Sequence, residues 1–179
     1  MRRVLLLLGL AAATIAHAAD TAGAPRLAVD IGVVPRVGVL YAGALDPGMA
    51  GLGLAAGAGA AFGLFVVDAG VEASSAPLGW QVLFPVRAGV RLSRGTVEVD
   101  VLGEGAPGVA LTRPVLFAAA LGAVVRVAWN VAPGFALTAS VGARYTVVPG
   151  YAAFAAADAS TLDIPLSLGV RLRPRSIGP

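Results

Sequence analysis

Cysteine is absent from the 179 residues, so a disulfide bridge and a thiolate metal site are both excluded. The single histidine, His17, lies close to the N-terminus. Charged residues are also scarce, at 13% of the chain compared with about 25% in soluble domains, whereas hydrophobic residues reach 58% compared with about 45–50%. The mean hydropathy of +0.84 agrees with that excess. This composition predicts contact with lipid, in a chain whose length fits one domain.

The N-terminal segment has the pattern of a secretory signal peptide. Arg2 and Arg3 precede a short apolar run, and small residues follow up to Ala18. We therefore predict that residues 1–19 are cleaved and that residues 20–179 form a single domain without histidine. The mature chain keeps 11 of its 13 basic residues against 10 acidic ones, which does not indicate nucleic acid. The alternative is an uncleaved anchor, for which the apolar run is too short.

The stretch from Trp80 to Glu104 contains the alternation on which the fold prediction depends. Before Gly95, apolar side chains alternate with polar or small ones, and after it three valines alternate with a threonine and two acids. Successive side chains leave opposite faces of a β-strand, so this period of two predicts strands. The short link that contains glycine predicts a hairpin.

Eight stretches of this kind follow the predicted signal peptide, and the links between them alternate in length. Short periplasmic turns and longer outer loops are typical of outer-membrane barrels, whose strands need about 9–11 residues to cross the hydrocarbon. The predicted strands are residues 27–41, 52–61, 64–73, 80–92, 96–104, 115–129, 135–147 and 162–173. The predicted links are long at 42–51, 105–114 and 148–161, shorter at 74–79, and tight at 62–63, 93–95 and 130–134.

The charged residues of these strands share one parity with glycine, serine and threonine, and the opposite parity is apolar. An arginine on the lipid face costs about 2–4 kcal/mol at the bilayer midplane, so in a membrane the charged parity must face inward. Seven acids and seven arginines, the last of them Arg173, would then nearly cancel in a lumen only wide enough for side chains. Glycines on the same parity would leave room for the arginines. The predicted lumen ion pairs involve Asp30, Arg36, Asp68, Glu72, Arg87, Arg91, Glu98, Asp100, Glu104, Arg126, Arg144, Asp163 and Arg171.

Two further pairings follow from this arrangement. If the first and last strands close the barrel, Asp30 and Arg171 become neighbours. Glu98 and Asp100 are expected to pair with Arg87 and Arg91 across the hairpin.

Aromatic residues gather near strand ends, as in the two girdles of membrane barrels. The predicted girdles are Phe62, Phe65, Trp129 and Phe135 near the tight turns, and Tyr41, Trp80 and Tyr145 near the long links.

Three features fit this prediction less simply. Pro35, Pro85 and Pro165 lie inside predicted strands, where a closed barrel has no free edge, so we expect them to mark bulges or strand ends. Residues 52–61 have no usable parity. Residues 49–67 carry no charge, as in a transmembrane helix, although their glycines oppose helix formation.

In strand number, loop asymmetry and parity, residues 26–174 resemble the small eight-stranded outer-membrane β-barrel proteins of diderm bacteria. The resemblance implies an all-β, antiparallel, up-and-down transmembrane barrel with a filled ionic lumen. It also implies a monomer surrounded by outer-membrane lipid. Such proteins usually end their last strand with a terminal aromatic residue, whereas this chain ends in RLRPRSIGP.

The resemblance implies a non-catalytic protein with a structural or surface-interaction role, in which long outer loops contact cell-surface polymers or proteins. One alternative is a narrow anion-preferring channel, because inward arginines can select anions. Another is a soluble secreted barrel or sandwich that binds an apolar ligand, because the same alternation arises when charges face water. We expect no cofactor, no metal and no catalytic residues, since Ser140 and Ser167 lack a histidine partner in the mature chain.

Overall fold

A computed structural model describes residues 26–41, 44–45, 50–76, 79–149 and 160–173. The predicted signal peptide lies outside the described residues, as do most of the links 42–49 and 150–159. The described residues include no helix that is long and apolar enough to cross a membrane.

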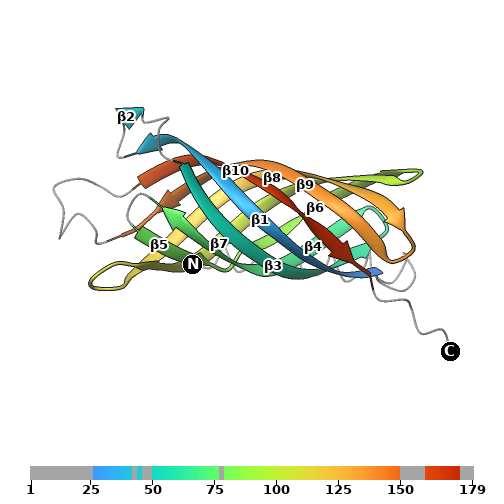
Figure 1. Cartoon of the computed structure of the whole chain (residues 1–179), viewed down its shortest axis with the longest axis horizontal. Coiled ribbons are helices and arrows are strands. Elements are labelled where there is room, and N and C mark those ends of the chain that lie inside the picture. The colour runs from blue at the N-terminus through green and yellow to red at the C-terminus, as the bar shows by residue number, and fades with distance from the viewer. Residues whose placement is uncertain (1–25, 42–43, 46–49, 77–78, 150–159, 174–179) are drawn as a thin grey trace, which may run out of the picture.

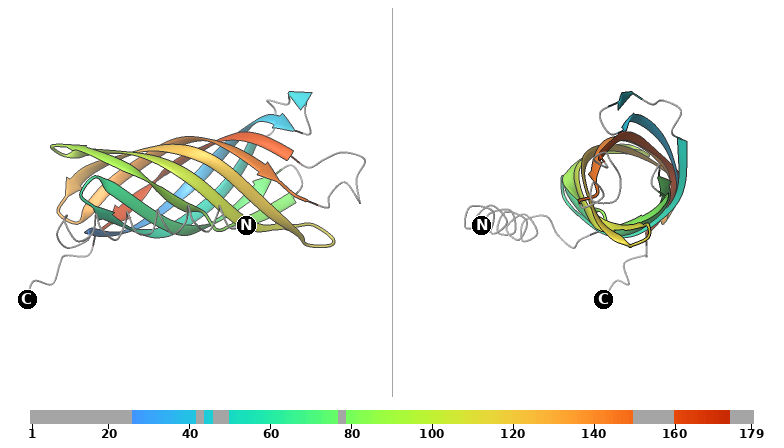
Figure 2. Two further views of the ribbon diagram at one scale, coloured as in Figure 1. Left: turned by 180° about the vertical axis from the view of Figure 1, so that it is seen from behind. Right: turned by 90° about the vertical axis from the view of Figure 1, so that its left-hand side faces the viewer.

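The described chain forms a closed antiparallel barrel of tilted strands (Figures 1 and 2). Both β5 and β6 pair with β4 and β7, so they are two halves of one strand, and β2 pairs only with the end of β1. Eight strands therefore surround the barrel, as the alternation predicts. The strands are β1 (Arg26–Tyr41), β2 (Ala44–Leu45), β3 (Ala50–Phe62), β4 (Phe65–Ala76), β5 (Gly79–Leu83), β6 (Val86–Arg94), β7 (Val97–Leu111), β8 (Leu116–Ala132), β9 (Phe135–Val147) and β10 (Ser160–Leu172).

The barrel closes between the first and last strands. β1 and β10 run antiparallel, and Asp30 stands directly opposite Arg171, which confirms the register predicted for that pair. Sequential antiparallel neighbours also confirm an up-and-down order. Residues 50–67 belong to β3, its turn and β4, so the helical alternative for that charge-free span is wrong.

Three tight turns define one end of the barrel, the turn end. Each turn contains a glycine with positive φ, namely Gly63 at 58°, Gly95 at 62° and Gly134 at 80°. Glycine adopts this conformation without the steric cost that a Cβ brings. The opposite end, where β4, β7 and β9 finish, is the loop end.

The prediction of a long link at residues 105–114 is wrong. Residues 105–111 continue β7, and only residues 112–115 link it to β8. The sequence pattern does not predict this part of the strand because the inward residues Ala106 and Ala110 are as apolar as the outward residues of β7. Alternation of polarity disappears when both faces of a strand are apolar.

The three prolines behave differently. Pro85 separates β5 from β6, as predicted. Pro165 lies inside β10, where pairing with β9 passes from Asp163–Arg144 to Leu166–Val141 without a register shift, so the predicted bulge is wrong there. Pro35 lies inside β1, opposite Leu52, and the shift in β1 occurs further on, between Gly38 and Leu40, so the prediction is wrong for Pro35 as well.

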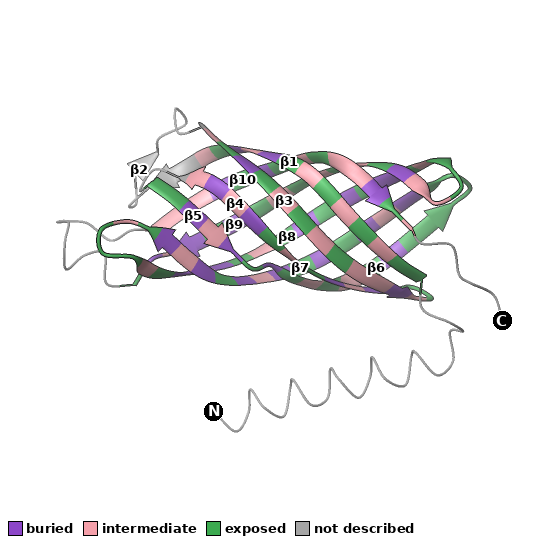
Figure 3. Ribbon diagram, turned by 60° about the horizontal axis from the view of Figure 1, so that its bottom comes forward, coloured by how far each residue is buried: buried purple, intermediate pink, exposed green. Residues whose placement is uncertain are grey.

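The two faces of the sheet divide by residue parity (Figure 3). The undetermined stretch in β3 now has a facing: Leu52, Leu54 and two alanines are exposed on the outside, while its glycines alternate inward. Of the predicted girdle residues, Phe65 and Trp129 are exposed near the turn end, and Trp80 and Tyr145 near the loop end. The side chain of Tyr41 lies outside the described part. The outer wall is therefore a band of exposed apolar side chains.

Candidate functional site: the lumen charge network

The charged side chains of the strands converge inside the barrel. All thirteen predicted residues and Arg173 face inward and form ion pairs. Most of these side chains are buried, whereas Asp30, Arg87 and Arg173 are partly exposed. Each of the seven acids contacts at least one arginine, so buried charge is compensated throughout the described lumen.

The half of the lumen nearer the turn end contains four arginines and four acids, which we call the turn-end cluster. Asp100 lies at its centre: its Oδ1 accepts from Arg91 Nε at 2.7 Å and its Oδ2 from Arg126 Nη2 at 2.8 Å. Arg171 donates to both carboxylate oxygens of Asp30, at 2.7 and 3.0 Å. The members are Asp30, Asp68, Arg91, Glu98, Asp100, Arg126, Arg171 and Arg173.

The half nearer the loop end contains three arginines and three acids, the loop-end cluster. Arg144 donates from both terminal nitrogens to Glu72 at 2.8 Å and from Nε to Glu104 at 2.7 Å. Arg87 Nε contacts the second oxygen of Glu104 at 2.6 Å. The remaining pair, Arg36 and Asp163, is tied to this cluster through Ser74, which accepts from Arg36 at 2.9 Å and donates to Glu72 at 3.4 Å.

Within the described residues, a single ion pair joins the two clusters. Arg87 Nη1 reaches Asp68 Oδ1 at 3.3 Å, a longer contact than the one it makes with Glu104. Each cluster is electrically neutral by itself, with four charges of each sign in one and three in the other. The lumen is therefore divided into two self-compensated regions.

The pairing across the β6–β7 hairpin differs in part from the prediction. Glu98 and Asp100 contact Arg91, at 3.2 and 2.7 Å. Arg87 instead pairs with Glu104 and Asp68, because it stands opposite both residues in the registers of β7 and β4.

Glycines lie opposite several charged residues, where the backbones of neighbouring strands come close. Gly122 lies opposite both Arg144 and Glu104, and a Cβ added there would come within 2.6 Å of the backbone oxygen of Ala143. Gly57 lies opposite Asp30, and a Cβ there would be 2.9 Å from the oxygen of Ala69. Only glycine allows the backbones to approach this closely.

Part of the lumen is apolar, which the alternation of polar and apolar residues does not predict. Beyond the loop-end cluster, the inner wall is formed by buried apolar side chains from β5, β7, β8 and the residue that follows β9. Leu83, which has the same parity as Gln81 and Arg87, was the signal that could have revealed it. The residues are Leu83, Ala106, Ala110, Ala118, Ala120 and Val148.

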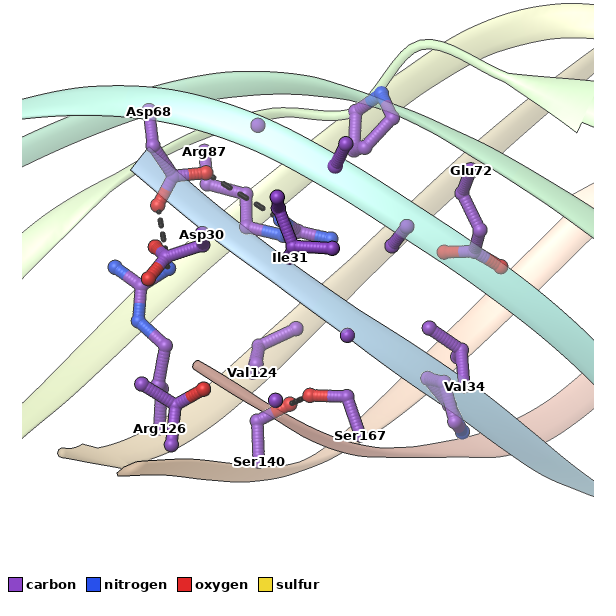
Figure 4. Close-up of a pocket in the computed structure, with 18 of the residues that line it drawn as sticks. Asp30, Ile31, Val34, Asp68, Glu72, Arg87, Val124, Arg126, Ser140 and Ser167 are labelled. Atoms are coloured by element: carbon purple, nitrogen blue, oxygen red, sulfur yellow. Dashed lines mark hydrogen bonds and ion pairs between the residues drawn. The ribbon is translucent and has the colours of Figure 1, made fainter. Parts of the chain in front are cut away.

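Hydroxyl groups complete the wall between the clusters. Ser140 and Ser167 stand opposite each other on β9 and β10, and their Oγ atoms are 2.6 Å apart (Figure 4). Among the described residues, no group of histidine, cysteine or acidic side chains has the arrangement of a metal site. The chemistry of the site is charge pairing, which ties strands together and fills the space between them.

Comparisons with known proteins identify no family. No protein-family model matches the sequence, and no curated protein matches it. The structure is similar to a chain from "De novo design of transmembrane beta-barrels", with a TM-score of 0.48 and 15% identity, covering 84% of this chain and 97% of the other. It is also similar to Neisserial surface protein A, with a TM-score of 0.48 and 15% identity, covering 83% of this chain and 96% of the other.

Proposed function

We propose that this chain is a non-catalytic outer-membrane β-barrel of a diderm bacterium, exported through its signal peptide. Its role is structural or surface-interacting, with cell-surface polymers or proteins contacted by the links at the loop end. Outer-membrane lipid surrounds a monomeric barrel. The proposal rests on one observation: among the described residues, the acids are all inside the barrel and the outer wall is apolar.

The distribution of exposed charge supports a membrane rather than water around the barrel. The exposed charged residues of the described part are Arg26, Arg94 and Arg113, and each lies at a barrel end. Between the ends, large apolar side chains such as Leu54 and Leu121 are 67% and 71% exposed. Soluble proteins rarely expose so large a continuous apolar area, so this wall disfavours the soluble alternative.

The lumen gives little support to the alternative of an anion channel. Most of its arginines contact carboxylates at 2.6–3.3 Å, and apolar side chains fill part of the loop end. A selective anion pathway needs cationic groups that can exchange their partner for a passing ion. We therefore propose a filled barrel.

Membrane insertion is tested by refolding the purified chain in the presence of phospholipid vesicles and floating the vesicles on a density gradient. We expect the folded protein to float with the lipid and to remain there after a urea wash. A monodisperse monomer that stays folded in plain buffer and does not float would contradict the proposal. In planar bilayers we expect no stepwise conductance, whereas an anion-selective current would favour the channel.

The surface-interaction role is tested separately, with protein extracted from native envelopes after cross-linking. A partner that is captured by the intact chain and lost when residues 150–159 are replaced by a glycine-serine linker would support it. A barrel that floats with vesicles but captures the same partners with and without that link would leave the membrane proposal intact and contradict the loop role.

A further inference from the structure

A cavity of about 80 Å³ lies in the middle of the lumen, between the two charge clusters (Figure 4). Asp30, Asp68 and Arg126 reach it from the turn-end cluster, and Glu72, Arg87 and Arg144 from the loop-end cluster. The hydroxyl pair of Ser140 and Ser167 faces it from β9 and β10. One water molecule needs about 10–15 Å³ of such a cavity and two to four polar partners, so this cavity has room and partners for several.

The two ends of this cavity differ in how tightly they are closed. Toward the loop end, the side chains of Glu72, Arg144 and Glu104 are 1%, 2% and 0% exposed, and the buried apolar residues lie beyond them. Toward the turn end, the charged side chains that line the cavity are more exposed, at 25% for Asp30, 6% for Asp68 and 9% for Arg126. Arg87, the single link between the clusters, is 19% exposed.

A second, smaller cavity continues in the direction of the turn end. Its volume is about 10 Å³, and Asp30, Asp68 and Arg126 line it as well as the larger cavity. Arg26 and Ala28, at the start of β1, form its outer part. The same three charged side chains therefore lie between the large cavity and a small one that is nearer the rim of the turn end.

We propose that the central cavity is a hydrated chamber that takes up water and water-sized monovalent ions from the turn end and is closed toward the loop end. The barrel then contains a half-channel rather than a pore. Asp30, Asp68 and Arg126 form its entrance, and Glu72, Glu104 and Arg144 form its floor. This inference goes beyond the proposed function and holds equally for a barrel in a detergent micelle.

The absence of cysteine makes the chamber testable with single serine-to-cysteine variants. Ser140→Cys places a thiol in the chamber, Ser74→Cys places one in the sealed loop-end cluster, and Ser93→Cys places one on an exposed site. Folded protein in micelles is treated with Ag⁺, a small cation that thiolates bind. After unfolding, a fluorescent maleimide counts the thiols that Ag⁺ has not blocked.

We expect Ser140→Cys to react at a rate within about tenfold of Ser93→Cys. Ser74→Cys should react at least about 100-fold more slowly than Ser93→Cys, since a sealed site is reached only by local opening. If Ser140→Cys disturbs folding, Ser167→Cys reports on the same wall, and Thr146→Cys replaces Ser74→Cys in the same way. A chamber thiol that reacts as slowly as the sealed one would overturn the proposal of a hydrated chamber.

The direction of entry is tested by narrowing the small cavity. Ala28→Phe adds an aromatic ring at the turn-end entrance, and Ala58→Phe makes the same change on the exposed face of β3 as a control. In the Ser140→Cys background, we expect Ala28→Phe to slow the reaction at least tenfold and Ala58→Phe to leave it unchanged. An undiminished rate with Ala28→Phe would overturn entry from the turn end.

Discussion

In the loop-end cluster, Arg144 is clamped between Glu72 and Glu104, and these three side chains are at most 2% exposed. In the turn-end cluster, Arg173 makes an equally short contact with Glu98, at 2.6 Å, but its side chain is 23% exposed. The two arginines have the same chemistry and comparable geometry. A charge left without a partner costs more free energy when it is buried than when water can reach it. We therefore expect the removal of Arg144 to destabilise the protein more than the removal of Arg173.

The largest expected effect is that of replacing the buried arginine, Arg144. Arg144→Leu leaves two carboxylates without their main partner and should lower the free energy of unfolding by about 3–5 kcal/mol. Arg173→Leu is the matched control at a partly exposed arginine, and it should lower the free energy of unfolding by about 1 kcal/mol or less. Urea unfolding of vesicle-inserted protein, followed by tryptophan fluorescence, measures both. Equal losses would mean that burial does not determine the cost of losing an arginine from the lumen.

The next effect contrasts the middle of the outer wall with the part of it near the turn end. Val125 lies near the middle of β8 and faces outward. Val125→Arg should cost about 2–4 kcal/mol in vesicles, the range for an arginine at the bilayer midplane. Val131→Arg, near the turn end of the same strand, should cost about 1 kcal/mol or less because the side chain reaches the interface. A Val125→Arg variant as stable as Val131→Arg would argue against lipid around the barrel.

A smaller effect is expected from pairs of substitutions, which test whether the two clusters contribute independently to the free energy of unfolding. Arg36→Met and Arg171→Met lie in different clusters, so their effects on unfolding should add within about 0.5 kcal/mol. Arg126→Met and Arg171→Met share Asp30 and Asp100, and should show a coupling of about 0.5–3 kcal/mol. Double-mutant cycles measure both couplings. Strong coupling between Arg36 and Arg171 would contradict the division of the lumen.

The smallest effect concerns the wall between the clusters. Ser167→Ala removes one member of the hydroxyl pair and should cost about 0.5–1.5 kcal/mol. Ser93→Ala, on an exposed site, should change stability by no more than about 0.5 kcal/mol. Thermal unfolding in detergent is sufficient to compare the two variants. No difference between them would indicate that the hydroxyl pair adds nothing to the fold.

Parity was sufficient to predict the barrel because the outer face and the lumen differ in polarity along most strands. It also predicted the register of Asp30 with Arg171, since closure brings the first and last strands together. It was insufficient at residues 105–111, where small apolar residues face inward as well. Pro165 shows a second limit, because a strand can lose one pairing step at a proline and keep its register.

The partners of individual arginines could be predicted only for neighbouring strands. Arg91 and Asp100 face each other across a hairpin, so their pairing follows from local register. Arg144 on β9 and Glu72 on β4 are on strands that do not pair, and they meet across the lumen. That contact depends on the tilt and closure of the whole barrel, which alternation in a single strand does not determine.

The most direct test of an apolar wall in lipid uses the two tryptophans, Trp80 and Trp129, which are 57% and 54% exposed at opposite ends of the barrel. Trp80→Phe and Trp129→Phe each leave one of them, and Val125→Trp in a background without both places one at mid-height. In vesicles with bromine at defined acyl depths, we predict that shallow bromines quench the two native tryptophans most strongly and deep bromines quench the one at position 125. Fluorescence that no brominated lipid quenches would contradict the account.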